Sequence, residues 1–245
     1  MNKIAIIIPS RLDAQRLPNK PLKRIDNKEM ILHVYEAAIN SKAGEVYIAT
    51  PDQEIIDIVK NVKGNVFKTS SHHETGTDRI FEVFKDALNS EPDIIINLQG
   101  DMPNIKPQSI YDLISHMKKN KCDIATLASD FSSKEEKKNP NVVKVAVKKK
   151  LSNNIYLKAL DFFRIKKNSK DNLYHHIGIY GFTKKALIRY VALKRSKLEL
   201  ERKLEQLRAL ENNMSIHVGY IEASPLSVDT EEDLIEVKKI MENKK

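Results

Sequence analysis

The sequence has few of the residues that build covalent or metal-bound frameworks. Tryptophan is absent, Cys122 is the single cysteine, and 245 residues include seven glycines. One cysteine excludes an internal disulfide and a cluster of cysteine ligands, which fits a reducing compartment. We expect Cys122 to be a core or surface thiol.

Long apolar runs are also missing. The run at the start of the sequence ends after a few residues at Pro9, which is too short for a signal peptide or a membrane span. We therefore expect a cytoplasmic protein without a membrane partner, and we interpret this run as a buried first strand.

The charge is positive but not concentrated. Lysine and arginine number 42 against 33 acidic residues, giving a net charge of +9. The lysines are spread along the chain, and no helix carries a continuous basic stripe with aromatic residues between the charges. This pattern argues against nucleic acid and favours small anionic ligands.

Strand-like and helix-like segments alternate in the first half. Apolar runs at residues 4–9, 46–50 and 94–98 are each followed by a helical pattern, at 30–40, 53–62 and 107–119. The alternation predicts an α/β fold of three layers, with a mostly parallel twisted sheet and helices on both faces. Ligands of such sheets bind beyond the carboxyl ends of the strands, so the loops after Ile8 and Leu98 should carry the chemistry.

The length suits one domain over residues 1–245, with a subdomain at about 130–195. The charged, turn-like residues 134–141 mark the edge of this subdomain. Strands are expected at 142–147 and 179–182, a helix at 184–193, and a long amphipathic helix at 197–211. Leu200, Leu204, Leu207 and Leu210 of that helix are predicted to face the core.

The loop after the first strand, PSRLDAQRLPNKPL, places Arg11, Arg16 and Lys20 close together. Three cations at the end of a strand can hold a nucleoside triphosphate and stabilise charge that moves to a leaving group. A solvated basic loop is the alternative. The phosphate-binding patterns GxxxxGK[ST] and GxGxxG are absent here, which disfavours ATPases and dehydrogenases.

Two further segments carry ligand-type residues. In NLQGDMP, Asp101 follows a buried strand and could bind Mg²⁺ together with phosphate oxygens, or else shape a turn. In HHETGTDR, Gly76 lies among threonine hydroxyls before a helix, where a ligand can approach the backbone, although Asp78 as an ordinary helix cap is the alternative.

These segments together resemble the 3-deoxy-manno-octulosonate cytidylyltransferases. The first loop resembles the family's IPAR…S.RLPGKPL, while NLQGDMP and HHETGTDR resemble VQGDEP and H.SGTDR. Three later segments, HHIGIYGF, EQLRALE and SVDTEEDL, resemble the family's RHLGIYGY, EQLR.L and VDTPEDL. The match runs along nearly the whole chain and in the family's order.

The resemblance implies a nucleotide-diphospho-sugar-transferase-like fold with a small dimerisation extension, a homodimer, and Mg²⁺ as cofactor. It implies transfer of a cytidylyl group from CTP to 3-deoxy-manno-octulosonate, releasing pyrophosphate, for lipopolysaccharide biosynthesis. The implied catalytic residues are Arg11, Lys20, Asp101 and Asp229, of which Asp101 and Asp229 bind the metal. The implied CTP-binding residues are Pro9, Ser10, Arg11, Lys20, Thr75, Gly76, Asp78, Arg79 and Gln99. The implied sugar-binding residues are Arg16, Gln99, His176, Tyr180, Glu205 and Gln206.

The chain departs from the family at several positions. Ser10, Asn19 and Met102 replace the usual Ala, Gly and Glu, and Lys158 and Ala159 replace the Ser and Arg of a YFSR segment. Arg164 is a candidate to replace the lost arginine. Two alternatives stay open: a cytidylyltransferase for 8-amino-octulosonic or nonulosonic (sialic-type) acids, and a non-catalytic nucleotide-binding protein.

Overall fold

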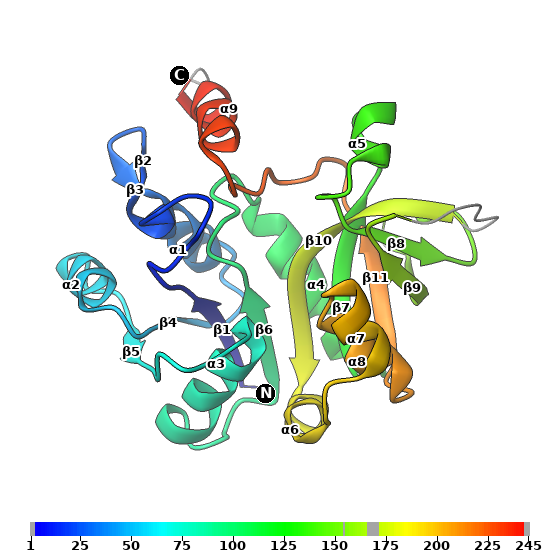
Figure 1. The fold of residues 1–245 in the computed structure, drawn as a ribbon. Coiled ribbons are helices and arrows are strands. Elements are labelled where there is room, and N and C mark those ends of the chain that lie inside the picture. Colours follow the sequence, from blue (N-terminus) through cyan, green and yellow to red (C-terminus); the bar gives the residue numbers. More distant parts are fainter. Residues whose placement is uncertain (1–2, 154, 166–171, 243–245) are drawn as a thin grey trace. The chain divides into compact units, whose positions relative to one another are not determined.

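The computed structural model describes residues 3–153, 155–165 and 172–242, which form two compact units (Figure 1). Unit 1 contains Met1–Asp112 and Pro225–Lys245, and unit 2 contains Leu113–Ser224. The predicted subdomain at about 130–195 falls inside unit 2, and the single domain over 1–245 stays a prediction. Within the described ranges, no helix combines the length and the apolar character that crossing a membrane requires.

Unit 1 contains the parallel sheet that the sequence predicts. Its strands lie in the order β5-β4-β1-β6, and each neighbouring pair is parallel. Every residue of β1 and β6 is buried, which explains why their sequences are continuous apolar runs rather than alternating ones. The strands are β1 (Ile4–Pro9), β4 (Glu45–Thr50), β5 (Val66–Lys68) and β6 (Ile94–Leu98), with a small hairpin of β2 (Arg24–Ile25) and β3 (Lys28–Glu29).

Helices connect these strands, and the strand order reverses after β5 because β6 pairs with the other side of β1. The gap beyond the carboxyl ends of β1 and β6 is therefore the switch point at which such sheets bind ligands. The helical segments are η1 (Lys20–Leu22), α1 (Met30–Asn40), α2 (Gln53–Asn61), α3 (Gly76–Glu82), η2 (Val83–Ala87) and α9 (Glu231–Glu242), and α4 (Pro107–Lys119) leads from unit 1 into unit 2.

The end of the chain returns to unit 1. Helix α9, red in Figure 1, buries Leu234 and Val237 in an apolar cluster with Leu17, Ile25 and Met30. Just before the helix, the Val228 N–H donates to the Asp101 carbonyl at 2.9 Å. Apolar packing and one backbone hydrogen bond thus hold the returning segment beside the loop that follows β6.

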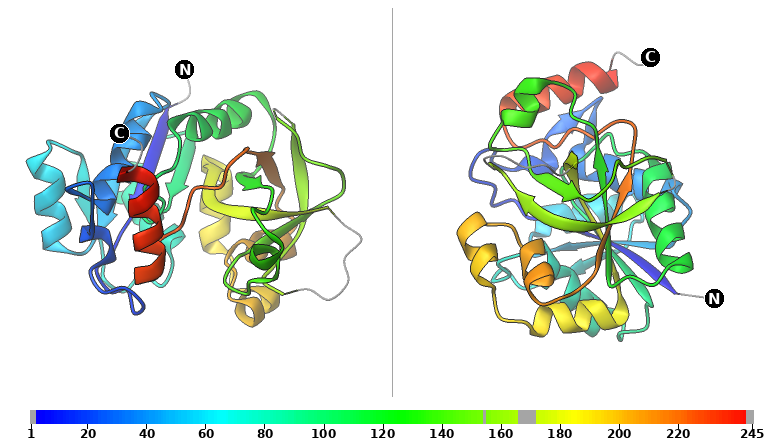
Figure 2. Two further views of the ribbon diagram at one scale, coloured as in Figure 1. Left: turned by 90° about the horizontal axis from the view of Figure 1, so that it is seen from above. Right: turned by 90° about the vertical axis from the view of Figure 1, so that its right-hand side faces the viewer.

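Unit 2 is a curved sheet of five strands, mostly green and yellow in the right view of Figure 2. β10 pairs with β7 and β8, β9 pairs with β8 and β11, and these pairings are antiparallel, whereas β7 and β11 are parallel. The pairings form a closed ring, so each of these strands has two partners within unit 2. The strands are β7 (Ile124–Ser129), β8 (Lys144–Val147), β9 (Tyr156–Phe163), β10 (Asn172–Thr183) and β11 (Ile216–Tyr220).

The helices of unit 2 correct two predictions. The charged stretch predicted as a turn contains the short helix α5 (Lys134–Lys138), capped by the Ser133 side chain. The long helix predicted at 197–211 is wrong, because two short helices, α7 (Lys197–Arg202) and α8 (Gln206–Glu211), take its place after α6 (Lys184–Ala192). Lys203 ends α7 with a left-handed backbone, φ 54°. Leu200 is accordingly 56% exposed, while Leu204 and Leu207 are buried.

A buried ion pair explains the break between α7 and α8. The Arg208 guanidinium donates to both carboxylate oxygens of Glu199, at 2.6 and 2.8 Å, and lies over the Tyr190 ring. In one continuous helix, residues nine positions apart would lie on opposite sides and about 13 Å apart along the axis. The turn at Lys203 is what brings them together, and α7 and α8 lie side by side in Figures 1 and 2.

We predict that Glu199→Gln destabilises the protein by about 3 kcal/mol, because it removes the anion that faces the buried Arg208 cation. Glu201→Gln is the matched control: Glu201 lies in the same helix, is exposed, and contacts Lys197 at 3.8 Å. Its cost should stay below about 0.5 kcal/mol. Urea unfolding followed by circular dichroism measures both, and equal midpoints for the two variants would contradict the prediction.

Candidate active site

A pocket of about 590 Å³ lies in unit 1 at the switch point. This volume is typical of sites for small molecules. Its walls come from the loop after β1, the start of α3, the loop after β6 and the segment before α9. The predicted residues that line it are Pro9, Ser10, Arg11, Arg16, Lys20, Thr75, Gly76, Arg79, Gln99, Asp101 and Asp229.

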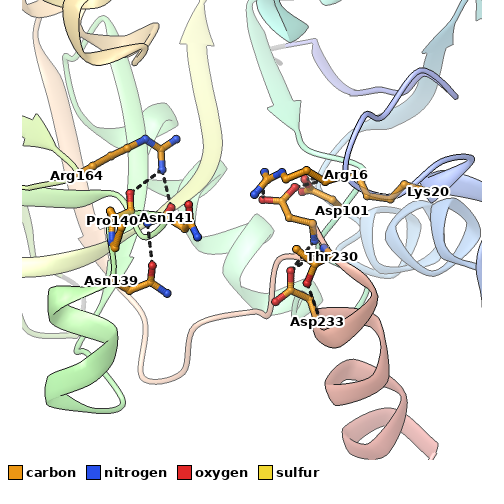
Figure 3. A network of polar contacts seen from close by, with 10 residues as sticks. Arg16, Lys20, Asp101, Asn139, Pro140, Asn141, Arg164, Thr230 and Asp233 are labelled. Carbon is orange, nitrogen blue, oxygen red and sulfur yellow. Dashed lines mark hydrogen bonds and ion pairs between the residues drawn. The ribbon is translucent and has the colours of Figure 1, made fainter.

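Lys20 joins the two predicted metal ligands. Its Nζ donates to Asp101 Oδ2 at 2.9 Å and to Asp229 Oδ1 at 3.1 Å, while Arg16 contacts Asp229 Oδ2 at 3.0 Å (Figure 3). Burial disfavours the charged amine, but the two carboxylates outweigh it and raise the pKa of Lys20. Lys20 is therefore an ammonium at neutral pH, and two cations balance two anions at this point of the pocket.

Local backbone geometry explains how the first loop presents Lys20. Asn19 has a left-handed conformation, φ 56° and ψ 30°, directly before the helical turn η1. This is the position where the family has glycine, and asparagine is among the residues that tolerate such a backbone best. The replacement of Gly by Asn19 thus preserves the turn.

The start of α9 is capped without the Asp229 side chain. The Asp233 carboxylate accepts the N–H groups of Asp229 and Thr230, at 2.9 and 2.8 Å, and the Thr230 hydroxyl accepts the Asp233 N–H (Figure 3). The Asp229 side chain therefore does not cap the helix. Its carboxylate contacts Lys20 and Arg16 instead.

At the start of α3, Thr75 is the cap rather than Asp78. The Thr75 hydroxyl accepts the Asp78 N–H and donates to the Asp78 carboxylate at 2.7 Å. Asp78 is not among the described residues that line the pocket, so it shapes the turn that presents its neighbours. A Cβ at Gly76 would lie 3.2 Å from Pro9 and 3.5 Å from the Gln99 amide, which shows how closely this turn approaches the β1 loop.

Arg79 is a buried cation of the pocket. Its Nη1 donates to Thr69 Oγ1 and to the Ser70 carbonyl at 2.9 Å. Burial is the largest cause that lowers the pKa of Arg79, and electrostatic repulsion by Arg11 lowers this pKa further. Two like charges that line the same pocket indicate a place where an anion would be stabilised.

Ser10, which replaces the family's alanine, adds a polar group to the same wall. Its side chain is buried, and its Oγ has no hydrogen-bond partner among the described residues. The Gln99 side chain, unlike that of Ser10, has a hydrogen-bond partner among the described residues, because its Nε2 donates to Asn97 Oδ1 at 2.9 Å. A buried hydroxyl without a partner at a pocket wall fits a polar ligand.

Asp101 and Asp229 have the chemistry required of ligands for a divalent cation. Both carboxylates already approach a single cationic atom, Lys20 Nζ, so they lie close enough to share one ion. Carboxylate oxygens are hard donors of the kind that Mg²⁺ prefers. The residues present therefore fit Mg²⁺.

The four remaining predicted sugar-binding residues lie in unit 2, where the structure brings them together. The rings of His176 and Tyr180 are 5.3 Å apart, and Tyr180 interacts electrostatically with Glu205, which is adjacent to Gln206. Burial lowers the pKa of His176 to about 3, so it is neutral, and its Nε2 lies 3.0 Å from the Thr126 hydroxyl. Tyr180 likewise stays protonated, because burial raises its pKa.

The altered YLKA segment forms part of β9. Ala159 is buried, whereas Lys158 is exposed and pairs with His217 of β11. Arg164 donates to the carbonyls of Asn141 and Pro140, at 2.6 and 3.4 Å (Figure 3). The Arg164 guanidinium thus braces a turn of unit 2.

Sequence reasoning missed several lining residues, among them Asp13, His73 and Glu74. All lie inside the quoted segments PSRLDAQRLPNKPL and HHETGTDR, so membership of these segments was the available signal. His73 contacts Glu82, and this contact lowers the pKa of that carboxyl against the opposing effect of burial.

Comparison with known proteins gives a consistent result. Residues 5–216 match the sequence profile of a family described as cytidylyltransferase. A 3-deoxy-manno-octulosonate cytidylyltransferase from Bartonella quintana is 45% identical over 245 residues, covering 98% of each chain. A solved CMP:2-keto-3-deoxy-manno-octonic acid synthetase complexed with CTP superposes with a TM-score of 0.88 at 35% identity, covering 99% of this chain and 100% of the other. A 4-diphosphocytidyl-2C-methyl-D-erythritol synthase from Anaerococcus prevotii, with a TM-score of 0.65 at 18% identity over 98% and 99% of the two chains, shares the fold.

Proposed function

The chain belongs to the 3-deoxy-manno-octulosonate cytidylyltransferase family, and on that premise we propose that it activates 3-deoxy-manno-octulosonate with CTP. The observation that carries the proposal is the convergence of Lys20, Asp101 and Asp229 in a pocket that also holds Arg11, Arg16 and Arg79. Such a pocket can hold a triphosphate and a divalent cation at once. The resemblance links the product to lipopolysaccharide biosynthesis.

In the proposed reaction, the anomeric hydroxyl of the sugar acid attacks the α-phosphorus of CTP. A new P–O bond to the sugar forms, the bond between the α-phosphorus and the bridging oxygen breaks, and pyrophosphate leaves. The hydroxyl proton passes to solvent. Such transfers depend mostly on positioning and electrostatic stabilisation, which is what a pocket of fixed charges offers.

Each charged residue has a distinct role. Arg11 and Lys20 would neutralise the triphosphate, and Arg16 would pair with a phosphate or with the sugar carboxylate. Gly76 lets the nucleoside approach the backbone, and the fixed Gln99 amide and the Ser10 hydroxyl offer hydrogen bonds. Asp101 and Asp229 would hold Mg²⁺, which would act as a Lewis acid toward the phosphate and make the attacking hydroxyl more acidic.

We predict that Asp101→Asn and Asp229→Asn each lower kcat at least about 100-fold, because a charge-stabilising contact at the reacting phosphate is lost. Pyrophosphate release from CTP and the sugar acid measures the rate. Asp57→Asn is the matched control, since Asp57 is exposed on α2 and bonds to Gln53 at 2.8 Å. Normal turnover by both pocket variants in Mg²⁺ would refute the metal assignment.

The same assay separates catalysis from mere binding. A non-catalytic nucleotide-binding protein would bind CTP with the affinity of an enzyme yet release no pyrophosphate when the sugar acid is added. That outcome would replace the transferase proposal.

The identity of the sugar rests on the unit 2 residues. His176, Tyr180, Glu205 and Gln206 retain the family's polar set, and a site built to bond hydroxyls rejects analogues that leave its groups unpaired. Lys158, by contrast, introduces an exposed cation on β9. The polar set favours the parent eight-carbon acid, and the new cation leaves an 8-amino-octulosonic or nonulosonic acid as alternatives.

We predict that kcat/KM for 3-deoxy-manno-octulosonate exceeds that for a nine-carbon nonulosonic acid by at least about 100-fold, since the extra carbon displaces hydroxyls from their partners. Side-by-side turnover with the parent, 8-amino and nine-carbon acids decides the question. A preference for the nine-carbon acid would overturn the eight-carbon assignment, and a preference for the 8-amino acid would replace the parent sugar.

We also propose a cytoplasmic homodimer. The GIYGF segment of β10 is mostly buried, so the surface left for a second copy lies on the amphipathic helix α6 that follows it, where Ile188 is 44% exposed. Two-fold dimers are also the commonest assembly. Light scattering at micromolar concentration should therefore give twice the 28.1 kDa mass of one chain. A mass of one chain at that concentration would contradict the dimer.

A further inference from the structure

Unit 2 contains a cluster of metal-ligand side chains that has no role in the proposed reaction. It consists of His116 of α4, Cys122 between α4 and β7, and His217 of β11. One ligand atom from each, two imidazole nitrogens and the thiol sulfur, lie within 4.8 Å of one another. Cys122 is buried and the two histidines are half-buried, so the cluster is open on one side.

The surrounding sheet fixes the position of His116. His217 and Gly219 of β11 pair with Lys158 and Tyr156 of β9, so these four residues share one face of the sheet. A Cβ at Gly219 would lie 2.3 Å from the Tyr156 ring, so only glycine leaves room for that ring. Tyr156 in turn stacks on the His116 imidazole, with ring centroids 3.6 Å apart and planes 7° apart.

The two imidazoles already face one another. His116 Nε2 lies 3.0 Å from His217 Nδ1, and the Asn120 side-chain amide lies 3.1 Å from His116 Nδ1. Burial lowers the pKa of His116 to about 4, and burial together with Lys158 lowers that of His217. Both rings are therefore neutral at physiological pH, and neutral imidazole is the form that binds metals.

We propose that His116, Cys122 and His217 bind a borderline transition metal such as Zn²⁺, with water as the fourth ligand. Tetrahedral zinc has bonds of about 2.0–2.1 Å to nitrogen and about 2.3 Å to sulfur, which place ligand atoms roughly 3.3–3.8 Å apart. The present atoms need to move by about 1 Å to reach that geometry. This inference does not depend on the transferase reaction.

Proton transfers accompany binding. The Cys122 thiol proton leaves to solvent as the sulfur becomes a thiolate ligand. When the metal takes His116 Nε2, the proton on that nitrogen moves through solvent to Nδ1, so the ring stays neutral and its N–H points away from the metal.

The nitrogen and sulfur donors separate this site from the carboxylate pair in unit 1. Mg²⁺ prefers oxygen ligands, while thiolate and imidazole favour zinc and its neighbours in the first transition row. One chain could accordingly hold two different cations without exchange between the sites.

The test is a titration of the full-length protein with Co²⁺, in the Asp101→Asn background so that the carboxylate site is weakened. Bound Co²⁺ should show thiolate-to-cobalt charge transfer in the near ultraviolet and tetrahedral bands in the visible, saturating at one equivalent, and Zn²⁺ should abolish both. Cys122→Ser should remove the charge-transfer band, and His217→Gln should weaken affinity by at least about 10-fold.

His72→Gln is the matched control, because His72 is an exposed histidine of unit 1, and it should change neither spectrum nor affinity. Pyrophosphate release by Cys122→Ser and His217→Gln in the otherwise native chain reports separately on the transferase. No charge-transfer band in the folded protein, or the same band in Cys122→Ser, would overturn the site whatever the activity. If Cys122→Ser does not fold, unchanged Co²⁺ affinity in His217→Gln would overturn it equally.

Discussion

The ammonium of Lys20 is the interaction on which the site depends. It joins Asp101, 81 positions along the chain, to Asp229, which is 209 positions from Lys20. Two carboxylates held side by side would repel one another in a partly buried pocket, and Lys20 and Arg16 remove that repulsion. The lysine therefore keeps the two carboxylates close together.

This charge arrangement rests on apolar packing nearby. The strands that carry the two loops are buried along their whole length, and the returning segment is fixed by the cluster around Met30 and Val237. Helix α9 is capped by Thr230 and Asp233, which leaves the Asp229 carboxylate for the pocket. Thr230 and Asp233 thus stabilise the start of the helix, whereas the Asp229 side chain lines the pocket. Asp229 can therefore be changed without removing the helix cap.

Most of the candidate site could be predicted because its residues lie in contiguous sequence motifs. Contacts between residues far apart in the sequence could not be predicted in this way. The β1 and β6 loops follow apolar runs that specify buried parallel strands, and their polar residues line one pocket. The break at Lys203 left no sequence signal, because the leucine spacing of two short helices equals that of one long helix. The Glu199–Arg208 pair that enforces the break is visible only in three dimensions. The same is true of His116 and His217, which lie 101 positions apart and meet only in the fold, where the Tyr156 ring packs over Gly219 and stacks on His116.

The return of the chain to unit 1 has a consequence for protein synthesis. Lys20 and Asp101 leave the ribosome early, whereas Asp229 follows only after all of unit 2 has been made. Domains generally begin to fold as they emerge, so the sheet of unit 1 can form while its second carboxylate is still missing. A nascent or prematurely terminated chain would then hold Lys20 with one anion instead of two. The charge balance of the pocket is therefore completed only when the last segment has been made.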